Sequence, residues 1–144
     1  EKFDSLNGGK IEPADLVYCL RGATMGKTAF VAPFTEGAIA SSLVIIRLDQ
    51  LVVCARFAYY FLTGPLGRSL IRRFDNGTAQ PNLSAESVKR YLVPLPPLAE
   101  QHRIVAKVDE LMALCDQLEA QLTTTQIDSR RLLGAVLEAA LTPA

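Results

Sequence analysis

The chain has 144 residues, of which 49% are hydrophobic, and its 15 basic side chains balance its 15 acidic ones. This hydrophobic content supports a packed core and excludes an intrinsically disordered chain, while the charges that interrupt every apolar run exclude a membrane span. Residues 1–97 hold 11 Lys and Arg against 8 Asp and Glu, and residues 98–144 hold 4 against 7, so a mildly basic first part is compatible with nucleic acid without requiring it.

Strand signals come first along the chain. Residues 15–21 alternate in β fashion and are rich in strand-forming residues, and residues 27–32 read as a return strand. Between them, residues 22–26 begin and end with glycine, which indicates a tight turn. A short apolar run predicts a third strand over residues 42–48. We therefore expect a β-hairpin followed by a further strand.

Helical signals follow the strands. Residues 53–62 combine helical spacing with aromatic bulk, and Pro65 is placed to open a second helix over residues 66–74. After a turn, Ser84 is suited to cap a short helix over residues 85–90. Residues 1–97 therefore predict an α/β (α+β) head built from short strands and helices.

The last third of the chain predicts one long helix. Residues 98–141 contain no proline and a single glycine, Gly134, and would extend about 65 Å at 1.5 Å per residue. Apolar side chains recur there with alternating spacings of 4 and 3, as in the core of a coiled coil. This stripe consists of Ile104, Val108, Leu111, Cys115, Leu118 and Leu122.

A helix of this length has two ways to cover its stripe. Part of the stripe can pack on the head, or the whole stripe can pair with a helix from a second copy or from another chain. Leaving it in water would be costly, because burial of one Leu or Ile contributes roughly 1.5–3 kcal/mol. We favour a helical partner and predict that residues 98–144 form a spacer and dimerisation helix.

No catalytic or metal-binding pattern stands out. Residues 22–28 resemble a phosphate-binding loop, but three residues separate the glycines where that motif has four, and a β-like segment follows. His102 is the only histidine and has no nucleophile motif beside it. Cys19, Cys54 and Cys115 form no CxxC pair, which argues against zinc and for buried thiols in a reducing, cytoplasmic setting.

Several basic and amide side chains suit DNA instead. Arg and Lys bind phosphate, and Arg, Gln and Asn can make paired hydrogen bonds to purine edges. Three arginines share the predicted helix 66–74, and two amides lie in the loop that follows this helix. Two further basic residues flank the 22–26 turn. A solvated surface would explain the same pattern. The candidates for DNA binding are Arg21, Lys27, Arg68, Arg72, Arg73, Gln80 and Asn82.

Two segments carry a family resemblance. Residues 77–84 (GTAQPNLS) and residues 93–108 (VPLPPLAEQHRIVAKV) together resemble the specificity (S) subunit of type I restriction–modification enzymes. Residues 15–27 (DLVYCLRGATMGK) resemble the hairpin of that family's target-recognition domain. The resemblance covers the chain from about residue 15 to residue 141.

The resemblance implies a non-catalytic function. The head would be the later part of a target-recognition domain that reads one half of a bipartite site in double-stranded DNA. The long helix would be a conserved spacer, which in the family packs antiparallel against a second spacer and docks methyltransferase subunits. We expect no cofactor in this chain, with S-adenosylmethionine, ATP and Mg on the modification and restriction subunits.

The chain also departs from a whole S subunit. It has one recognition domain and one spacer helix where the family has two of each, and it does not begin with Met. We therefore expect a carboxy-terminal fragment or a half-sized protein that dimerises through its long helix. The alternative function is a helical adaptor without a DNA role.

Overall fold

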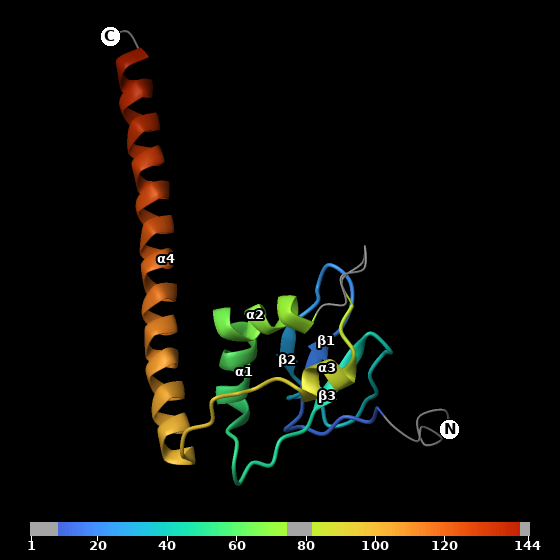
Figure 1. Ribbon diagram of the computed structural model, residues 1–144. Coiled ribbons are helices and arrows are strands. Elements are labelled where there is room, and N and C mark those ends of the chain that lie inside the picture. Colours follow the sequence, from blue (N-terminus) through green and yellow to red (C-terminus); the bar gives the residue numbers. More distant parts are fainter. Residues whose placement is uncertain (1–8, 75–81, 142–144) are drawn as a thin grey trace. The chain divides into compact units, whose positions relative to one another are not determined.

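The computed structural model describes residues 9–74 and 82–141, and the chain divides into two compact units, residues 1–105 and residues 106–144 (Figure 1). The α/β (α+β) class and the long final helix are as predicted. The elements of the described residues are β1 (Leu16–Cys19), β2 (Thr28–Phe30), β3 (Leu43–Ile46), α1 (Ala55–Thr63), α2 (Pro65–Phe74), α3 (Ala85–Lys89) and α4 (Leu98–Leu141).

The sheet has β1 at its centre. Among the described residues it is three-stranded, in the order β2–β1–β3, and both pairings are antiparallel. Val17 of β1 lies opposite Ala29 of β2 and Ile45 of β3. The predicted hairpin is therefore present, with Gly22 and Gly26 in its turn at φ values of 80° and 82°, a region that favours glycine.

The core lies between the sheet and the helices that follow it. Leu16 and Tyr18 of β1 are completely buried, and Ala58 and Leu62 of α1 pack in the same cluster. Tyr91 closes the cluster, because its hydroxyl lies 3.3 Å from the hydroxyl of Tyr18. Burial and this hydrogen bond raise the pKa of Tyr18 above its ordinary value, so the pair stays neutral inside the head.

Two helices meet at a tight corner. The N–H of Gly64, just after α1, donates to the carbonyl of Tyr60 over 2.9 Å, and Pro65 begins α2. Gly67 has no room for a β-carbon, which would overlap the backbone of Phe61 and Leu62. This close approach fixes the direction of α2.

Farther along the chain, the N–H of Ser87 donates to the Ser84 hydroxyl over 3.0 Å, so the predicted cap of α3 is present.

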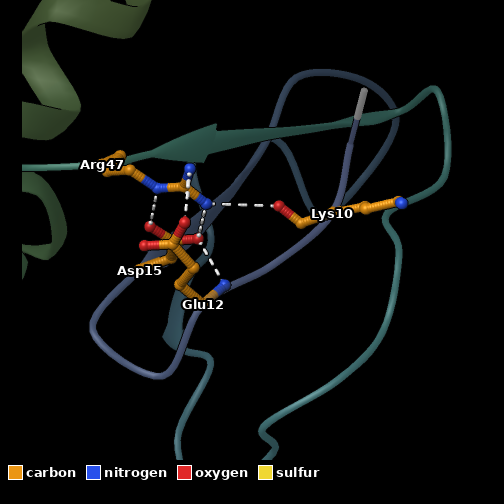
Figure 2. A network of polar contacts seen from close by, with 4 residues as sticks. All are labelled: Lys10, Glu12, Asp15 and Arg47. Atoms are coloured by element: carbon orange, nitrogen blue, oxygen red, sulfur yellow. Dashed lines mark hydrogen bonds and ion pairs between the residues drawn. The ribbon is translucent and has the colours of Figure 1, made fainter. Parts of the chain in front are cut away.

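A network of ions ties the start of β1 to the end of β3 (Figure 2). Arg47 donates from Nε to Oδ1 of Asp15 over 2.8 Å and from Nη2 to Oδ2 over 2.7 Å. Arg47 also pairs with Glu12 over 2.9 Å and donates to the carbonyl of Lys10 over 3.2 Å. The hydrogen bond from Arg47 is the largest cause that holds the pKa of Asp15 below its usual value, and burial opposes it.

The first turns of α4 belong to the first unit. Gln101 is completely buried: its side-chain carbonyl accepts from the Cys54 N–H over 2.8 Å, and its amide donates to the carbonyls of Val52 and Pro96, each over 2.9 Å. Val105, one turn later, is also buried. Because of these contacts the first unit extends to Val105, whereas the sequence suggested a boundary after Pro97.

The helix α4 continues for 44 residues without interruption. Thr123, Thr124 and Thr125 stay helical, and each hydroxyl donates to the carbonyl four residues earlier over 2.9–3.0 Å. Gly134 also lies within the helix, as predicted. Within the described part of the chain, no helix combines the length and the apolar character needed to cross a membrane.

Candidate nucleic-acid interface

The hairpin turn and α2 form the two sides of a groove of about 580 Å³, which we call the cationic groove. Three of the seven candidate DNA-binding residues line it together, Lys27 from the hairpin and Arg68 and Arg72 from α2. The other lining residues are Ala23, Met25, Gly26, Thr28, Tyr59, Thr63 and Ile71. Folding thus brings into one groove basic side chains that are far apart in the chain.

A glycine contact holds the two sides together. Gly26 has a φ of 82° and lies so close to Ile71 that a β-carbon would overlap the Ile71 side chain. Each contact residue is followed in sequence by a basic residue, Lys27 on the hairpin and Arg72 on α2. The spacing of these two cations is therefore fixed by packing beneath them, and rigid placement of this kind favours a binding surface.

The cationic groove carries no compensating acid among the described residues. Neither the turn at residues 21–28 nor α2 contains Asp or Glu. Ion pairs elsewhere in the described residues use other basic side chains, among them Arg47, Lys89, Arg103, Lys107 and Arg131. Lys27, Arg68 and Arg72 are exposed, and no ion pair to them is found within residues 9–74 and 82–141.

A second groove of about 540 Å³ adjoins the first and shares Thr63, Arg68 and Arg72 with it. Pro65 and Ser69 complete its lining. The two arginines therefore stand between adjacent hollows, on one face of α2, because residues four apart in a helix share a face. A continuous basic surface of this kind suits a polyanion.

The remaining candidates lie elsewhere or outside the described residues. Arg21 is exposed and forms an isolated antiparallel bridge with Asn82, and neither residue lines the cationic groove. The Oδ1 atom of Asn82 is buried and has no hydrogen-bond partner among the described residues. Arg73 is exposed on α2 but lines neither groove, and Gln80 lies outside the described residues.

Most of the predicted stripe on α4 is exposed. Leu111, Leu118 and Leu122 have 48%, 50% and 63% of their surface exposed, and Cys115 is exposed as well. Ile104 and Val108, nearer the start of the helix, are half-buried. Further along the helix, Leu132, Leu133, Val136, Leu137 and Leu141 are also more than half exposed. A helix with this much exposed apolar surface is a candidate docking surface.

Other expectations have mixed outcomes. Cys19 is buried, Cys54 is half-buried and Cys115 is exposed. The prediction of three buried thiols is therefore wrong for Cys115, which lies in a part of α4 whose described side chains are all exposed. His102 is exposed on α4, as expected of a surface residue. Within the described part of the chain, no cluster of His, Cys, Asp or Glu has the geometry of a metal site.

The structure adds features that the sequence did not reveal. An apolar cleft of about 660 Å³ lies among α1, α2, the extended segment after α3 and the start of α4. It is lined by Phe57, Tyr60, Phe61, Leu66, Pro94, Leu95, Pro96 and Ile104. The basic grooves are also lined by Tyr59, Thr63 and Ser69, which were not among the predicted site residues. Their only sequence signal is nearness to the basic residues of α2, which is too weak to single them out.

A scan of family models then identifies the chain. The model described as the type I restriction modification DNA specificity domain matches residues 11–126. The chain belongs to this family. The family is defined by DNA specificity and its relatives are specificity subunits, so the chain belongs with the non-catalytic part of these systems, as predicted.

Curated relatives of the type I specificity family cover almost the whole chain. The EcoBI specificity subunit of Escherichia coli is 25% identical over 128 residues, which are 89% of this chain and 27% of that subunit. The EcoKI specificity subunit of Escherichia coli strain K12 is 28% identical over 135 residues, which are 92% of this chain and 29% of the relative. The chain thus spans less than a third of the length of either relative.

Solved structures of this class have the same fold. One, from work on complex assembly and conformational transition of the type I R-M system, aligns with a TM-score of 0.76 at 25% identity, over 92% of this chain and 35% of its own. The HsdS subunit of Thermoanaerobacter tengcongensis aligns with a TM-score of 0.75 at 24% identity, over 98% of this chain and 37% of its own. The small sheet and long helix are therefore features shared with these proteins.

Proposed function

We propose that this chain reads one half of a bipartite site in double-stranded DNA, with the cationic groove on the side that faces DNA. The observation that carries the proposal is the convergence of Lys27, Arg68 and Arg72 on one groove whose described lining residues include no acid. Such a surface attracts the phosphate backbone. Membership of a DNA specificity family supports DNA as the ligand of this groove.

We further propose that the chain supplies one recognition domain and one spacer helix. It spans 27% and 29% of two curated relatives and 35% and 37% of two solved chains, which is less than half in each case. Two copies, or this segment joined to a second recognition domain and spacer helix in a longer protein, would then read both halves of the site. S-adenosylmethionine, ATP and Mg would be bound by the methyltransferase and restriction subunits, and this chain would hold no cofactor.

The test is selection of DNA by the chain, alone and with a methyltransferase subunit of the type I class. A random duplex library is passed over the protein, and the bound fraction is sequenced after several rounds. A half-site reader that pairs by two-fold symmetry should enrich two inverted half-sites separated by an unspecified spacer. Absence of any enriched sequence with the methyltransferase present would refute the proposal.

A pair of variants tests whether DNA binds at the cationic groove. Arg68→Ala/Arg72→Ala removes two charges from the cationic groove, and Arg130→Ala/Arg131→Ala removes two from exposed positions on α4. Each phosphate contact contributes about 0.9 to the slope of log affinity against log salt, so the first variant should lower the slope by about 1.8. The control variant should leave it unchanged, and equal effects would remove the groove from consideration.

The long helix is the second part of the proposal. Leu111, Leu118 and Leu122 are about half exposed, although burial of each would contribute roughly 1.5–3 kcal/mol. We infer that the stripe pairs antiparallel with the same helix of a second copy and offers its flanks to methyltransferase subunits. Helical pairing would cover the stripe in the way that its alternating spacing favours.

Light scattering tests the pairing. Leu111→Glu/Leu118→Glu should convert a dimer into monomers at micromolar concentration, because two carboxylates per copy enter an apolar seam. Ala113→Glu/Ala120→Glu adds the same charge with the same seven-residue separation on another face of α4 and should leave the dimer intact. A wild-type chain that is already monomeric at tens of micromolar would contradict self-pairing.

The exposed stripe also favours one other function, a helical adaptor without a DNA role. Near-neutral net charge is compatible with that function. The library selection separates the two, because an adaptor would bind its protein partner and enrich no DNA sequence.

A further inference from the structure

The basic grooves present hydrogen-bond donors. Lys27, Arg68 and Arg72 carry donors and no acceptor. The residues that line the two grooves, as far as the structure describes them, include no Asp, Glu, Asn or Gln. The grooves therefore lack the carboxylate and amide oxygens with which proteins accept hydrogen bonds from adenine and cytosine amino groups.

The hydroxyl groups in these grooves are turned toward the main chain. Thr28, Thr63 and Ser69 each donate to a carbonyl of their own segment, over 3.3, 2.8 and 2.7 Å. Their hydrogens are thus already used within the protein. The donors that remain in the lining side chains, apart from the Tyr59 hydroxyl, are one ammonium and two guanidinium groups, all positively charged.

The arrangement of these charges matches a strand of phosphates better than a single base. Arg68 and Arg72 are one helical turn apart, which is about 6 Å at 1.5 Å per residue. Lys27 faces them from the hairpin. Each DNA strand carries one charge per 3.4 Å of helix axis, so a row of cations meets a row of anions. Gly26 and Gly67 fix both sides of the row by close packing.

The described amide candidate lies at another place in the head. Asn82 bridges to Arg21 and does not line the cationic groove. Asn is a residue type that can donate to and accept from one adenine edge, whereas a phosphate requires donors alone. Asn82 therefore lies beside Arg21 and apart from the three cations of the groove, so the groove contains basic side chains without the described amide candidate.

We propose, on the basis of the function proposed above, that the cationic groove binds the sugar-phosphate backbone of one DNA strand and reads no base. Arg68, Arg72 and Lys27 bind consecutive or facing phosphates and set the register of the head on the duplex. Sequence reading then belongs to residues outside this groove. Affinity and specificity are accordingly separable by substitution.

The experiment compares the DNA sequences that three proteins select from a random duplex library: wild type, Arg68→Ala/Arg72→Ala and Arg68→Lys/Arg72→Lys. All three should enrich the same sequence. The alanine variant should lose about 60-fold in affinity at 0.1 M salt, equally for the selected and a scrambled duplex. A slope lower by about 1.8 changes log affinity by about 1.8 over the tenfold interval from 1 M salt, where the counterion contribution vanishes, to 0.1 M. The lysine variant should keep the salt slope, since an ammonium also binds phosphate.

Two outcomes would overturn the backbone assignment while leaving the proposed function intact. Loss of preference at one base position in both variants would show that an arginine reads a base edge through paired bonds, which lysine does not reproduce. Unchanged affinity of the alanine variant would show that the groove does not contact DNA. Failure of the wild type to enrich any sequence would instead refute the proposed function itself. Both arginines are exposed, and matching thermal melts would verify that the variants fold.

Discussion

Asp15 is the residue whose replacement best tests how the sheet is held together. Its side chain is 1% exposed and accepts three hydrogen bonds, two from Arg47 and one from the N–H of Glu12 over 2.7 Å. Asp15→Asn keeps the size of the side chain and one acceptor for Glu12. It removes the negative charge and replaces one of the two oxygens that accept from Arg47 by an NH2 group, which weakens the tie between β1 and β3.

The size of the effect follows from burial. Hydrogen bonds to a charged group contribute about 1.5–3 kcal/mol each. Two effects reduce the total loss of stability. The half-exposed Arg47 can be hydrated in the variant, and the desolvation cost of burying a carboxylate is absent. We expect a net loss of about 2 kcal/mol in the free energy of unfolding, which corresponds to about 8 °C at about 4 °C per kcal/mol.

The loss should depend on pH in one direction. The pKa of Asp15 in the folded chain lies below its ordinary value of 3.8, so folding favours the ionised form. The stabilisation is therefore fully present above pH 3.8 and disappears as the pH falls through the lower folded-state pKa. Wild type and Asp15→Asn should differ at pH 7 and converge below pH 3.8.

Urea unfolding followed by circular dichroism at pH 7 and at several values below 4 measures both quantities. Glu86→Gln is the control, because Glu86 pairs with Lys89 at the surface and both side chains are at least 70% exposed. That variant should show no measurable change in stability. A difference for Asp15→Asn that is absent at pH 7, or that persists unchanged at low pH, would refute the reasoning.

Two further substitutions address packing and buried polarity. Gly26→Ala should lower the free energy of unfolding by about 2–5 kcal/mol, because it combines left-handed backbone strain with overlap on Ile71. Gly22→Ala is the control: Gly22 has nearly the same φ but no atom within 4 Å of an added β-carbon, so the loss should be only about 1–2 kcal/mol. Equal losses in urea unfolding would contradict the steric argument. Gln101→Leu should lower the free energy of unfolding by about 2–4 kcal/mol, because one backbone N–H and two carbonyls lose their buried partner, whereas Gln121→Leu on exposed α4 should be neutral in the same assay.

The order of the elements could be predicted from local signals. Gly22 and Gly26 mark the hairpin turn, Pro65 opens α2 and Ser84 caps α3, and each signal acts over a few neighbouring residues. The predicted strands were longer than the observed ones, because pairing with β1 limits their length and the sequence does not show where pairing stops. Local propensity thus places an element more reliably than it places its ends.

The candidate DNA surface was predicted in part. Residue type alone selected five basic candidates. Three of them, Lys27, Arg68 and Arg72, lie together in the cationic groove, whereas Arg21 and Arg73 line neither groove. Nothing in the local pattern separates these groups. The separation arises where Ile71 packs against Gly26, a contact between distant parts of the chain.

What the sequence determined by itself is the long helix and its apolar stripe, because helical spacing and the absence of proline act through bonds between residues three or four apart. What only the tertiary structure decided is which charges are used inside the head and which face outward. Arg47 is paired with Asp15, 32 residues away, and Gln101 with Cys54, 47 residues away, whereas no such pair involves the cations of the groove in the part of the chain that the structure describes. The energy of such pairs depends on distance and burial, which are set only when the whole head has folded.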